Sequence, residues 1–300
     1  MDKIGLPRGL FYYYYGDIWK YFFDYLRMPY IVSPNTNKDI MARGNNNSND
    51  EMCLALKTYL GHVSYLSEKC DYVVIPRIDN YKLDNQTCTN FLSVYDIVKN
   101  TFDIKVLHYN IDLTKKQTLK KGLINIGLEL GKNEKELKKA YKSAIIKYQK
   151  DRKRDIITNI NKLNSNKTKI LLVSHPYNTY DDLIGKDVIK YLEKNNIEVI
   201  FSDKFEEKIT NKLSKKLSKD IYFKYSKDNI GSIVYVQDKV DGIIFLSSFP
   251  CGPDSLVNEL VMRKIDLPHI NLIFDDTSSF AGLETRLESF IDILKEKDYD

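Results

Sequence analysis

Asp241-Gly242-Ile243-Ile244-Phe245-Leu246 is a short continuous apolar run, and Phe249-Pro250-Cys251-Gly252-Pro253-Asp254-Ser255 follows it almost directly. A run of this kind predicts a strand that is buried on both faces, as in a parallel sheet. The proline and glycine residues of the second stretch indicate a turn, and Asp254 and Ser255 are typical of a first helical turn. We therefore predict a strand that leads into a helix, with Cys251 at the junction.

Similar strands recur along the chain and alternate with helices. The predicted strands are Pro29–Pro34, Asp71–Pro76, Ile104–Leu107, the run from Lys169 to just before His175, Glu198–Phe201, Asp241–Leu246 and Pro268–Ile273. The predicted helices are Leu10–Leu26, a helix from Asn49 or Asp50 to Lys69, Phe91–Asn100, most of Lys115–Leu163, Asp181–Lys194, Glu206–Leu217, Asp254–Lys264 and Gly282–Lys295, with a polar loop at Asn35–Asn49. This alternation predicts an α/β protein with parallel sheets covered on both faces.

Two such runs, separated by the polar segment Asn164-Ser165-Asn166-Lys167, indicate two Rossmann-like lobes with a cleft between them. We expect an N-terminal α/β lobe with a helical extension at residues 1–165 and a C-terminal α/β lobe at residues 166–300.

Composition restricts the function classes. The chain has 300 residues, 43% hydrophobic and 29% charged, and a net charge of +5 from 46 basic and 41 acidic residues. Its lysines concentrate between Lys115 and Lys169, and no nucleic-acid-binding motif accompanies them, so a solvated helical face is favoured over a nucleic-acid site. No apolar run approaches the ~20 residues of a membrane helix, and Met1-Asp2-Lys3-Ile4-Gly5 lacks the regions of a signal peptide. We expect a cytoplasmic protein.

The cysteines carry most of the chemical information. The chain has four cysteines and no CxxC, and a cytosolic chain of this size is not expected to use them as disulfides. Cys53, Cys88 and Cys251 are each predicted where a loop enters a helix, at the carboxyl edge of a parallel sheet, where such sheets bind ligands. Helix starts also favour thiolates. For Cys53 and Cys88 the alternative, a buried small hydrophobic residue, stays open.

Cys251 is a poor candidate for simple burial, because it lies in a Pro-Cys-Gly-Pro turn in which Gly252 allows close backbone approach. Cys70, between a helix and a strand, is predicted to pack.

His175 follows a strand end, and two roles are open: a proton or hydrogen-bond donor in the cleft, or loop capping. His62 lies about 2.5 turns beyond Cys53, on the opposite helix face, and is predicted to pack.

Two arginines are candidates for an anion such as a CoA phosphate or a substrate carboxylate. Arg77 follows a predicted strand end and has the better position. For Arg8, a surface or inter-lobe salt bridge is slightly favoured. The chain has no GxGxxG after a strand and no GxxxxGK[ST], so ATP hydrolysis is expected of a partner and not of this chain.

The chain resembles the DUF2229 family, whose members are described as acyl-CoA dehydratase activase-related or CoA-protein activase. That family is similar to the iron–sulfur subunits of 2-hydroxyacyl-CoA dehydratase and benzoyl-CoA reductase. The stretches that carry the resemblance are Lys3–Arg8, Ser33–Lys38, Asp50–Leu54 with Lys57, Gly61 and His62, Tyr72–Arg77, Cys88 before Phe91-Leu92, His175–Asn178, Leu246–Phe249, Cys251–Ser255 and Ala281–Glu288.

The resemblance implies that Cys53, Cys88 and Cys251 are metal ligands of one [4Fe–4S] cluster in the cleft, with one iron lacking a cysteine from this chain. Gly252, His175 and Arg77 are the further cofactor-binding residues that we predict. The implied role is low-potential electron transfer or dehydratase-type chemistry in anaerobic metabolism, with an ATPase activase or a dehydratase-like subunit as partner. An acyl-CoA or another small ligand and a homodimer are further expectations. Whether the chain is itself an enzyme is open.

The chain departs from the family pattern at two places. Thr89-Asn90 follows Cys88, where the family usually has Pro-Lys, and Asp275-Asp276-Thr277-Ser278 replaces a histidine-containing run. These changes keep two alternatives open. One is a scaffold or regulatory partner that has the same fold and no cluster. The other is a zinc site formed by the three cysteines and a histidine such as His175.

Overall fold

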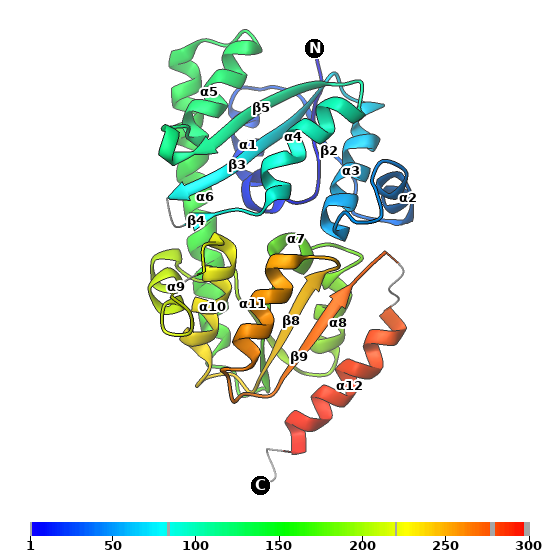
Figure 1. The fold of residues 1–300 in the computed structure, drawn as a ribbon. Coiled ribbons are helices and arrows are strands. Elements are labelled where there is room, and N and C mark those ends of the chain that lie inside the picture. The colour runs from blue at the N-terminus through cyan, green and yellow to red at the C-terminus, as the bar shows by residue number, and fades with distance from the viewer. Residues whose placement is uncertain (1, 83–84, 220, 277–279, 297–300) are drawn as a thin grey trace. The chain divides into compact units, whose positions relative to one another are not determined.

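The computed structural model describes residues 2–82, 85–219, 221–276 and 280–296 of the chain, and it confirms the α/β class with two parallel sheets (Figure 1). The chain forms two compact units. The first comprises Met1–Arg152 with Tyr222–Lys224, and the second comprises Lys153–Ile221 with Tyr225–Asp300. The predicted division into folding domains at residues 165 and 166 stays a prediction.

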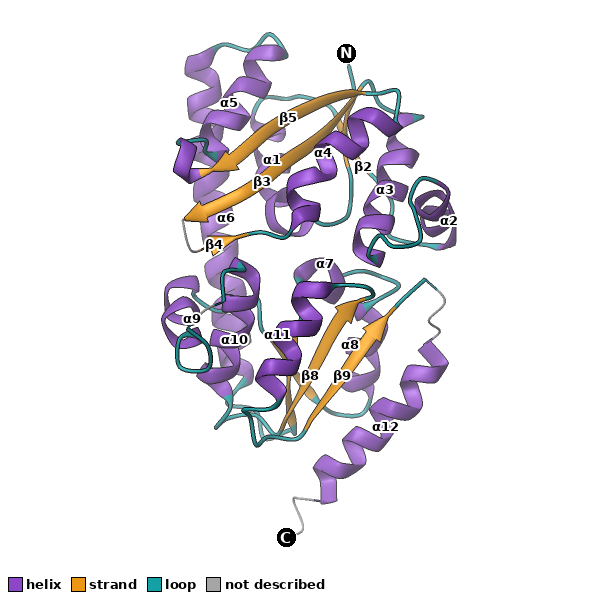
Figure 2. Cartoon of the chain, viewed as in Figure 1, coloured by secondary structure: helices purple, strands orange, loops and turns teal. Residues whose placement is uncertain are grey.

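The sheet of the first unit is parallel apart from one short strand (Figure 2). Its order is β2-β1-β3, with β5 parallel to β3 on the other side and β4 antiparallel to β3. The strands are β1 (Ile4–Leu6), β2 (Tyr30–Val32), β3 (Tyr72–Lys82), β4 (Asn85–Gln86) and β5 (Lys105–Asp112). The helices are α1 (Tyr12–Tyr25), α2 (Lys38–Asn46), α3 (Leu54–Ser67), α4 (Thr89–Thr101) and α5 (Leu119–Glu129), with a short 3-10 turn at Leu113–Lys115. Helix α6 (Glu134–Lys162) starts in this unit and ends in the second.

Helix α1 follows from the spacing of its apolar residues. Tyr15, Ile18, Trp19, Phe22 and Phe23 recur every three or four positions and are buried together. A stripe of this width is what a helix needs to cover one face of a sheet. Its charged residues lie outside this stripe, since Asp17 and Asp24 are exposed and Lys20 is half-buried.

Helix α3 is buried nearly all round over its first ten residues, Leu54–Val63. A helix that is buried on every side, including its polar residues Lys57, Thr58 and His62, must be enclosed by other elements. Helix α2 supplies part of that enclosure, and the two helices approach through Gly44 and Gly61, where a Cβ would overlap the opposite backbone. The two glycines therefore set the distance between α2 and α3.

The sheet of the second unit is fully parallel, in the order β7-β6-β8-β9. Its strands are β6 (Lys169–Val173), β7 (Glu198–Phe201), β8 (Gly242–Ser248) and β9 (His269–Phe274). Its helices are α7 (Pro176–Thr179), α8 (Gly185–Lys194), α9 (Glu207–Ser214), α10 (Lys224–Val236), α11 (Gly252–Met262) and α12 (Phe280–Glu296). Every residue of β8 is buried, which confirms the sequence interpretation of its apolar run.

Four local expectations were wrong or incomplete. The segment Asn35–Asn49 is not all loop, because it contains α2, whose N-cap Asn37 accepts from Ile40 N at 3.0 Å. The third strand does not end at Pro76 but runs to Lys82. The elements β1, β4, α7 and α10 were not predicted. Helix α3 starts after Cys53, while Asn49 closes the preceding turn by accepting from Met52 N.

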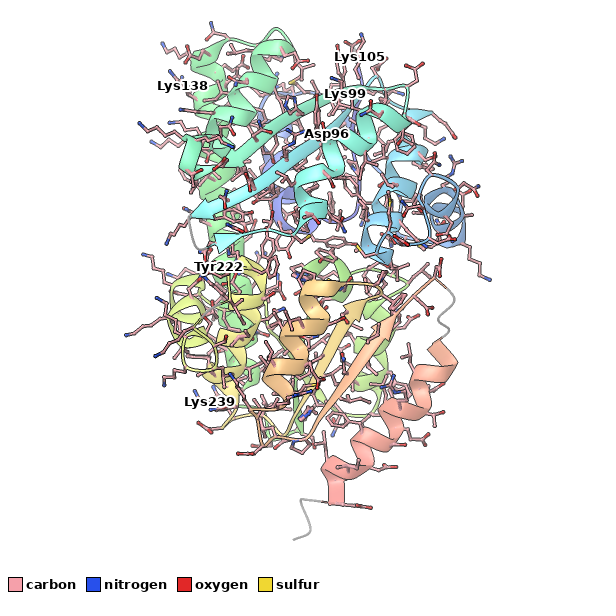
Figure 3. All side chains as sticks on the ribbon, viewed as in Figure 1. Asp96, Lys99, Lys105, Lys138, Tyr222 and Lys239 are labelled. Carbon is pink, nitrogen blue, oxygen red and sulfur yellow. The ribbon has the colours of Figure 1, made fainter. Side chains whose placement is uncertain are left out.

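The surface of both units carries many charged side chains. Lys138 and Lys239 are exposed examples, labelled in Figure 3. Within the described part of the chain, none of the helices has both the length and the apolar character needed to cross a membrane.

Candidate functional site

The three candidate cysteines share one local geometry. Cys53, Cys88 and Cys251 are the N-cap residues of α3, α4 and α11, respectively. Each has an extended backbone, each is half-buried, and none of them caps its helix with a side-chain hydrogen bond. The prediction that each stands at a helix start is confirmed. Such a position places a thiol next to first-turn N–H groups and the positive end of the helix dipole, which favour the thiolate.

In the first unit, Asn90 connects two of these helix starts. Asn90 lies two residues after Cys88, and its Nδ2 donates to Cys53 Sγ at 3.2 Å. The first turn of α4 therefore lies against the thiol of Cys53. A sulfur that accepts an N–H hydrogen bond is stabilised in its anionic form. Asn90 is also one of the residues at which the chain departs from the family pattern.

The routes from strand to cysteine differ between the candidates. In the second unit, Cys251 follows β8 after only Phe249 and Pro250, as predicted. In the first unit, α2 lies between β2 and Cys53, and the β3–β4 hairpin lies before Cys88. The simple picture of a strand that leads directly into the cysteine therefore holds for Cys251 alone among the three.

In the second unit, His175 lies near the start of α11. The order β7-β6-β8-β9 reverses direction between β6 and β8, and ligands of such sheets bind outside the strand ends at that point. His175 follows β6, and its Nε2 lies 2.9 Å from Oδ1 of Asp254 in the first turn of α11. The two residues are only 7% and 6% exposed. An ionised Asp254 would accept from Nε2–H and so select that tautomer of the ring.

Aromatic rings enclose this pair. The ring of Tyr177 stacks on His175 with a centroid distance of 4.8 Å, and Tyr225 meets it edge-on at 5.8 Å. His175 is the N-cap of α7 but makes no side-chain cap, so of the two roles left open, capping by the ring is not what the structure shows. Sequence reasoning gave Asp254 a structural place in the first turn, and its pairing with a residue 79 positions away had no signal in the sequence.

Further buried polar side chains lie at the same strand ends. Ser248 Oγ donates to Asn178 Oδ1 at 2.6 Å, and Ser174 Oγ donates to Leu246 O at 2.6 Å. The amide nitrogen of Asn178 is buried and has no partner among the described residues. This edge of the second sheet is therefore polar, although the strands that lead to it are apolar.

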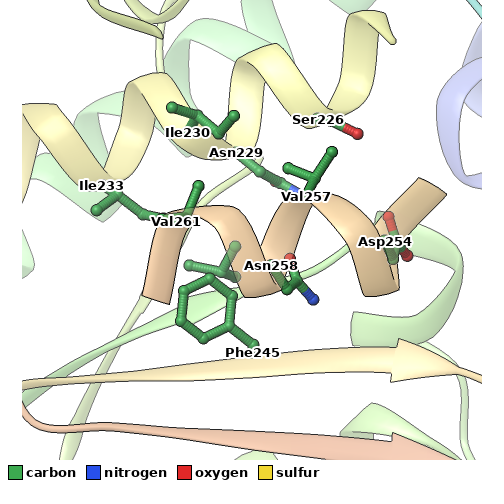
Figure 4. A pocket seen from close by; sticks show the side chains of 10 residues that line it. Ser226, Asn229, Ile230, Ile233, Phe245, Asp254, Val257, Asn258 and Val261 are labelled. Atoms are coloured by element: carbon green, nitrogen blue, oxygen red, sulfur yellow. The ribbon is translucent and has the colours of Figure 1, made fainter. Parts of the chain in front are cut away.

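The position of Gly252 is open. No described atom of the protein lies within 4 Å of the place where its Cβ would be, so the protein itself does not require a glycine there. A small pocket lies nearby between α10 and α11 (Figure 4). Its wall combines apolar side chains such as Ile230, Ile233 and Val257 with polar ones. The polar side chains are Ser226, Asn229, Asp254 and Asn258.

Two other predicted residues have structural surroundings. Cys70 lies between α3 and β3, and burial, together with the nearby Asp71, raises the pKa of its thiol. A raised pKa disfavours the thiolate that metal binding needs, in agreement with its exclusion from the site. His62 is fully buried, as a packing role requires, and its Nε2 lies 3.1 Å from Thr36 Oγ1.

Arg77 has a different setting from the one predicted. It lies within β3 and not after a strand end, and its guanidinium pairs with Asp96 of α4, which is labelled in Figure 3. The guanidinium also lies over the ring of Tyr95, 5.0 Å from the centroid. Much of the charge of Arg77 is therefore already compensated, and its role in cofactor binding stays a prediction.

Within the described residues, no group of three or more histidine, cysteine, aspartate or glutamate side chains is arranged to hold a metal ion. Cys53 and Cys88 belong to the first unit, and Cys251 belongs to the second. Their use as one ligand set stays a prediction. Thr277 and Ser278, where the family pattern has a histidine-containing run, lie outside the described residues.

Comparison with known protein families gives a match. The model of the CoA enzyme activase uncharacterised domain, DUF2229, matches residues 3–205, which is 203 of the 300 residues. The matched segment contains Cys53, Cys88 and His175 and ends before Cys251. No curated protein matches the chain.

Proposed function

The chain belongs to the DUF2229 family, and on this premise we propose that Cys53, Cys88 and Cys251 bind one [4Fe–4S] cluster. The proposed role is transfer of a low-potential electron in a system similar to 2-hydroxyacyl-CoA dehydratase. When bound, such a cluster supplies one-electron transfer at a potential set by net charge, hydrogen bonds to sulfur and solvent exposure. The rest of the proposal concerns what the residues of this chain contribute.

One observation supports the ligand set above all others. The three cysteines are all half-buried N-caps with extended backbone, whereas Cys70 is not an N-cap and its thiol pKa is raised. Thiolate ligands carry negative charge, and helix starts offer the N–H groups and the dipole that stabilise it. The donor set is therefore chemically suited to iron–sulfur ligation, and Cys70, the one cysteine that we excluded, does not stand at a helix start.

Neighbouring side chains would tune this site. Asn90 donates to Cys53 Sγ, and hydrogen bonds to ligand sulfur stabilise the more negative, reduced state. In the second unit, Asp254 lies three residues after Cys251. Its carboxylate fixes the ring of His175. His175 would hold a proton at Nε2 toward Asp254 and present Nδ1 on the other side of its ring.

The energy for a low-potential electron would come from a partner. The chain has neither of the common phosphate-binding loops, so we propose an ATPase activase as the donor, with a dehydratase-like subunit or an acyl-CoA as the acceptor. The description of the family as a CoA enzyme activase domain supports a role alongside such an activase.

The His175–Asp254 pair favours a second candidate, a zinc site. Histidine ligands of zinc commonly donate their other ring N–H to a carboxylate, and this is the arrangement of Nε2 and Asp254. Three cysteines and His175 Nδ1 would form a Cys₃His set, which Zn²⁺ accepts readily. The two candidates differ in colour, because thiolate-bound iron–sulfur clusters absorb visible light and zinc does not.

The test is the metal and acid-labile sulfide content of protein purified without oxygen, together with its visible spectrum. The proposal expects about four irons and four sulfides per chain, the composition of a cubane cluster. Colourless protein that contains zinc, or that cannot be reconstituted with iron and sulfide, would overturn it in favour of the zinc or scaffold function.

Matched cysteine variants locate the site. Cys251→Ala should abolish iron binding, and Cys53→Ala and Cys88→Ala should do the same. Cys70→Ala is the control and should keep the full iron content. Iron retention in Cys251→Ala would show that the ligand assignment is wrong even if the protein is brown.

A further inference from the structure

Arg8 lies just beyond the carboxyl end of β1, the strand at which the order of the first sheet reverses. It follows β1 after Pro7, and the order β2-β1-β3 reverses direction between β1 and β3. The crevice outside the carboxyl ends of the two strands at such a reversal is the usual ligand site of open α/β sheets. Arg8 therefore lies on the β1 side of such a reversal, where β1 and β2 end level with each other.

The side chain of Arg8 is held in place by its own unit. Its backbone N donates to Ser33 Oγ at 2.8 Å, and its Nε donates to Ser33 O at 3.1 Å. The guanidinium lies over the ring of Tyr12, 5.5 Å from the centroid. Because β1 and the residue after β2 fix both ends of the side chain, little conformational freedom would be lost when it binds a ligand.

The charge of Arg8 is not compensated by a carboxylate. Among the described residues, no acidic side chain lies within the 4.0 Å of an ion pair, so the salt bridge that the sequence slightly favoured is not present. A guanidinium has five N–H donors. Among the described residues, only the Nε–H of Arg8 meets an acceptor. Arg43, Arg77 and Arg263, in contrast, each meet a carboxylate.

The surroundings of Arg8 are buried and lack a negative charge. Ser33 is fully buried, and no described group accepts its hydroxyl proton. Burial and the charge of Arg8 lower the pKa of His62 to about 3, so that ring is neutral. Its Nδ1 is buried without a partner in the part of the chain that the structure describes. A half-buried cation among neutral polar groups is stabilised when an anion joins it.

We propose that Arg8 binds an oxyanion of a small molecule, a phosphate or a carboxylate, at the carboxyl ends of β1 and β2. The guanidinium supplies the charge and a two-pronged set of donors, and the Ser33 hydroxyl supplies a further donor. The site lies wholly in the first unit and does not depend on the proposed cluster.

The test is a titration of the full-length protein with three probes: inorganic phosphate, acetate and coenzyme A. Saturable binding that Arg8→Gln weakens by about tenfold or more is expected, because loss of one charged hydrogen-bonded pair has at least that effect. Arg8→Lys keeps the charge without the planar fork, and its affinity should lie between those of wild type and Arg8→Gln. Arg43→Gln is the matched control, since Arg43 is also half-buried but already pairs with Asp39 and Glu68.

The probes identify the source of the anion. Binding of phosphate and coenzyme A, with acetate a weak competitor, assigns a phosphate site, and the reverse order assigns a carboxylate site. The proposal is overturned if wild-type protein shows no saturable binding of any probe, or if Arg8→Gln binds as tightly as wild type. If circular dichroism shows that Arg8→Gln is unfolded, the comparison of Arg8→Lys with Arg43→Gln decides the question: equal affinities overturn the proposal.

Discussion

Replacement of Gly61 by alanine is expected to force α2 and α3 apart. A Cβ at this position would stand 2.0 Å from Ile40 O and 3.0 Å from Gly44 N. Both atoms belong to the backbone of α2, so rotation of a side chain cannot relieve the overlap. Since real Cβ atoms essentially never come closer than 3.0 Å, the backbones must separate locally by at least 3.0 − 2.0 = 1.0 Å.

Two opposing free-energy changes set the size of the effect. Overpacking of a buried contact destabilises by about 1–3 kcal/mol, and the upper half of that range applies when main-chain atoms must move. Alanine in a helix is favoured over glycine by about 1 kcal/mol. The free energy of unfolding of the first unit should therefore fall by about 1–2 kcal/mol in Gly61→Ala.

Urea unfolding followed by tryptophan fluorescence measures this change. Trp19 is the only tryptophan of the chain, and it is fully buried in the first unit, so its emission follows that unit. Gly282→Ala is the control, because no described atom lies within 4 Å of an added Cβ there and it should leave the Trp19 transition unmoved. A Gly61→Ala protein that unfolds at the urea concentration of wild type, or above it, would refute the backbone overlap.

Three further predictions concern the buried polar groups. The pKa of His62 is lowered from 6.5 to about 3, so the unfolded chain binds a proton there that the folded chain does not. Stability of the first unit should therefore fall as pH drops from about 6.5 toward 3, and His62→Gln should flatten that slope in urea unfolding. Asn90→Ala removes the donor to Cys53 Sγ and should slow alkylation of Cys53 in metal-free protein at pH 7, measured by mass spectrometry; an unchanged rate would contradict the contact. Asp254→Ala leaves His175 Nε2 buried without its acceptor and should lower the free energy of unfolding by about 1–3 kcal/mol, followed by circular dichroism. Asp254→Asn keeps a side-chain oxygen and should lower it less, so equal losses would argue against the hydrogen bond.

The elements that were predicted correctly are those whose signal is local. The strands β6 and β8 contain continuous apolar runs, and a buried parallel strand needs little else. The cysteine positions at helix starts follow from the turn residues around Cys251 and from the apolar periods after Cys53 and Cys88. These features depend on neighbours within a few residues, which the sequence displays directly.

Helix α2 was missed because its stability is mainly tertiary. Its sequence is rich in asparagine and glycine, and it buries only Ile40 and Gly44. Close packing on Gly61 of α3 supplies what its own apolar content does not. One local signal was available, since Asn37 caps the helix, but a cap without an apolar period after it is also typical of a loop.

The structural settings of Arg77 and Arg8 differ from the expected ones for a similar reason. The apparent strand end at Pro76 favoured Arg77 as the anion-binding residue, but pairing with β5 continues β3 beyond it. Asp96 then reaches Arg77 from α4. The sequence before Arg8 gave no sign of β1, because a strand of three residues is too short to show a hydrophobic alternation.

The two units repeat one plan, and this repetition explains the layout of the candidate residues. In each sheet the first strand of the unit, β1 or β6, lies beside the third, β3 or β8. Arg8 follows the first strand of one unit, and His175 follows the first strand of the other. Cys88 and Cys251 are the N-cap residues of corresponding helices, α4 and α11. Each helix leads into the last strand of its sheet, β5 or β9.

The third cysteine breaks the equivalence. Cys53 caps α3, the helix that leads into β3, and the corresponding helix of the second unit, α10, begins at Lys224 without a cysteine near its start. Repetition of an α/β unit therefore accounts for two of the three thiols and for their common geometry as N-caps. The addition of Cys53, together with Asn90, which donates to its sulfur, is what distinguishes the first unit chemically.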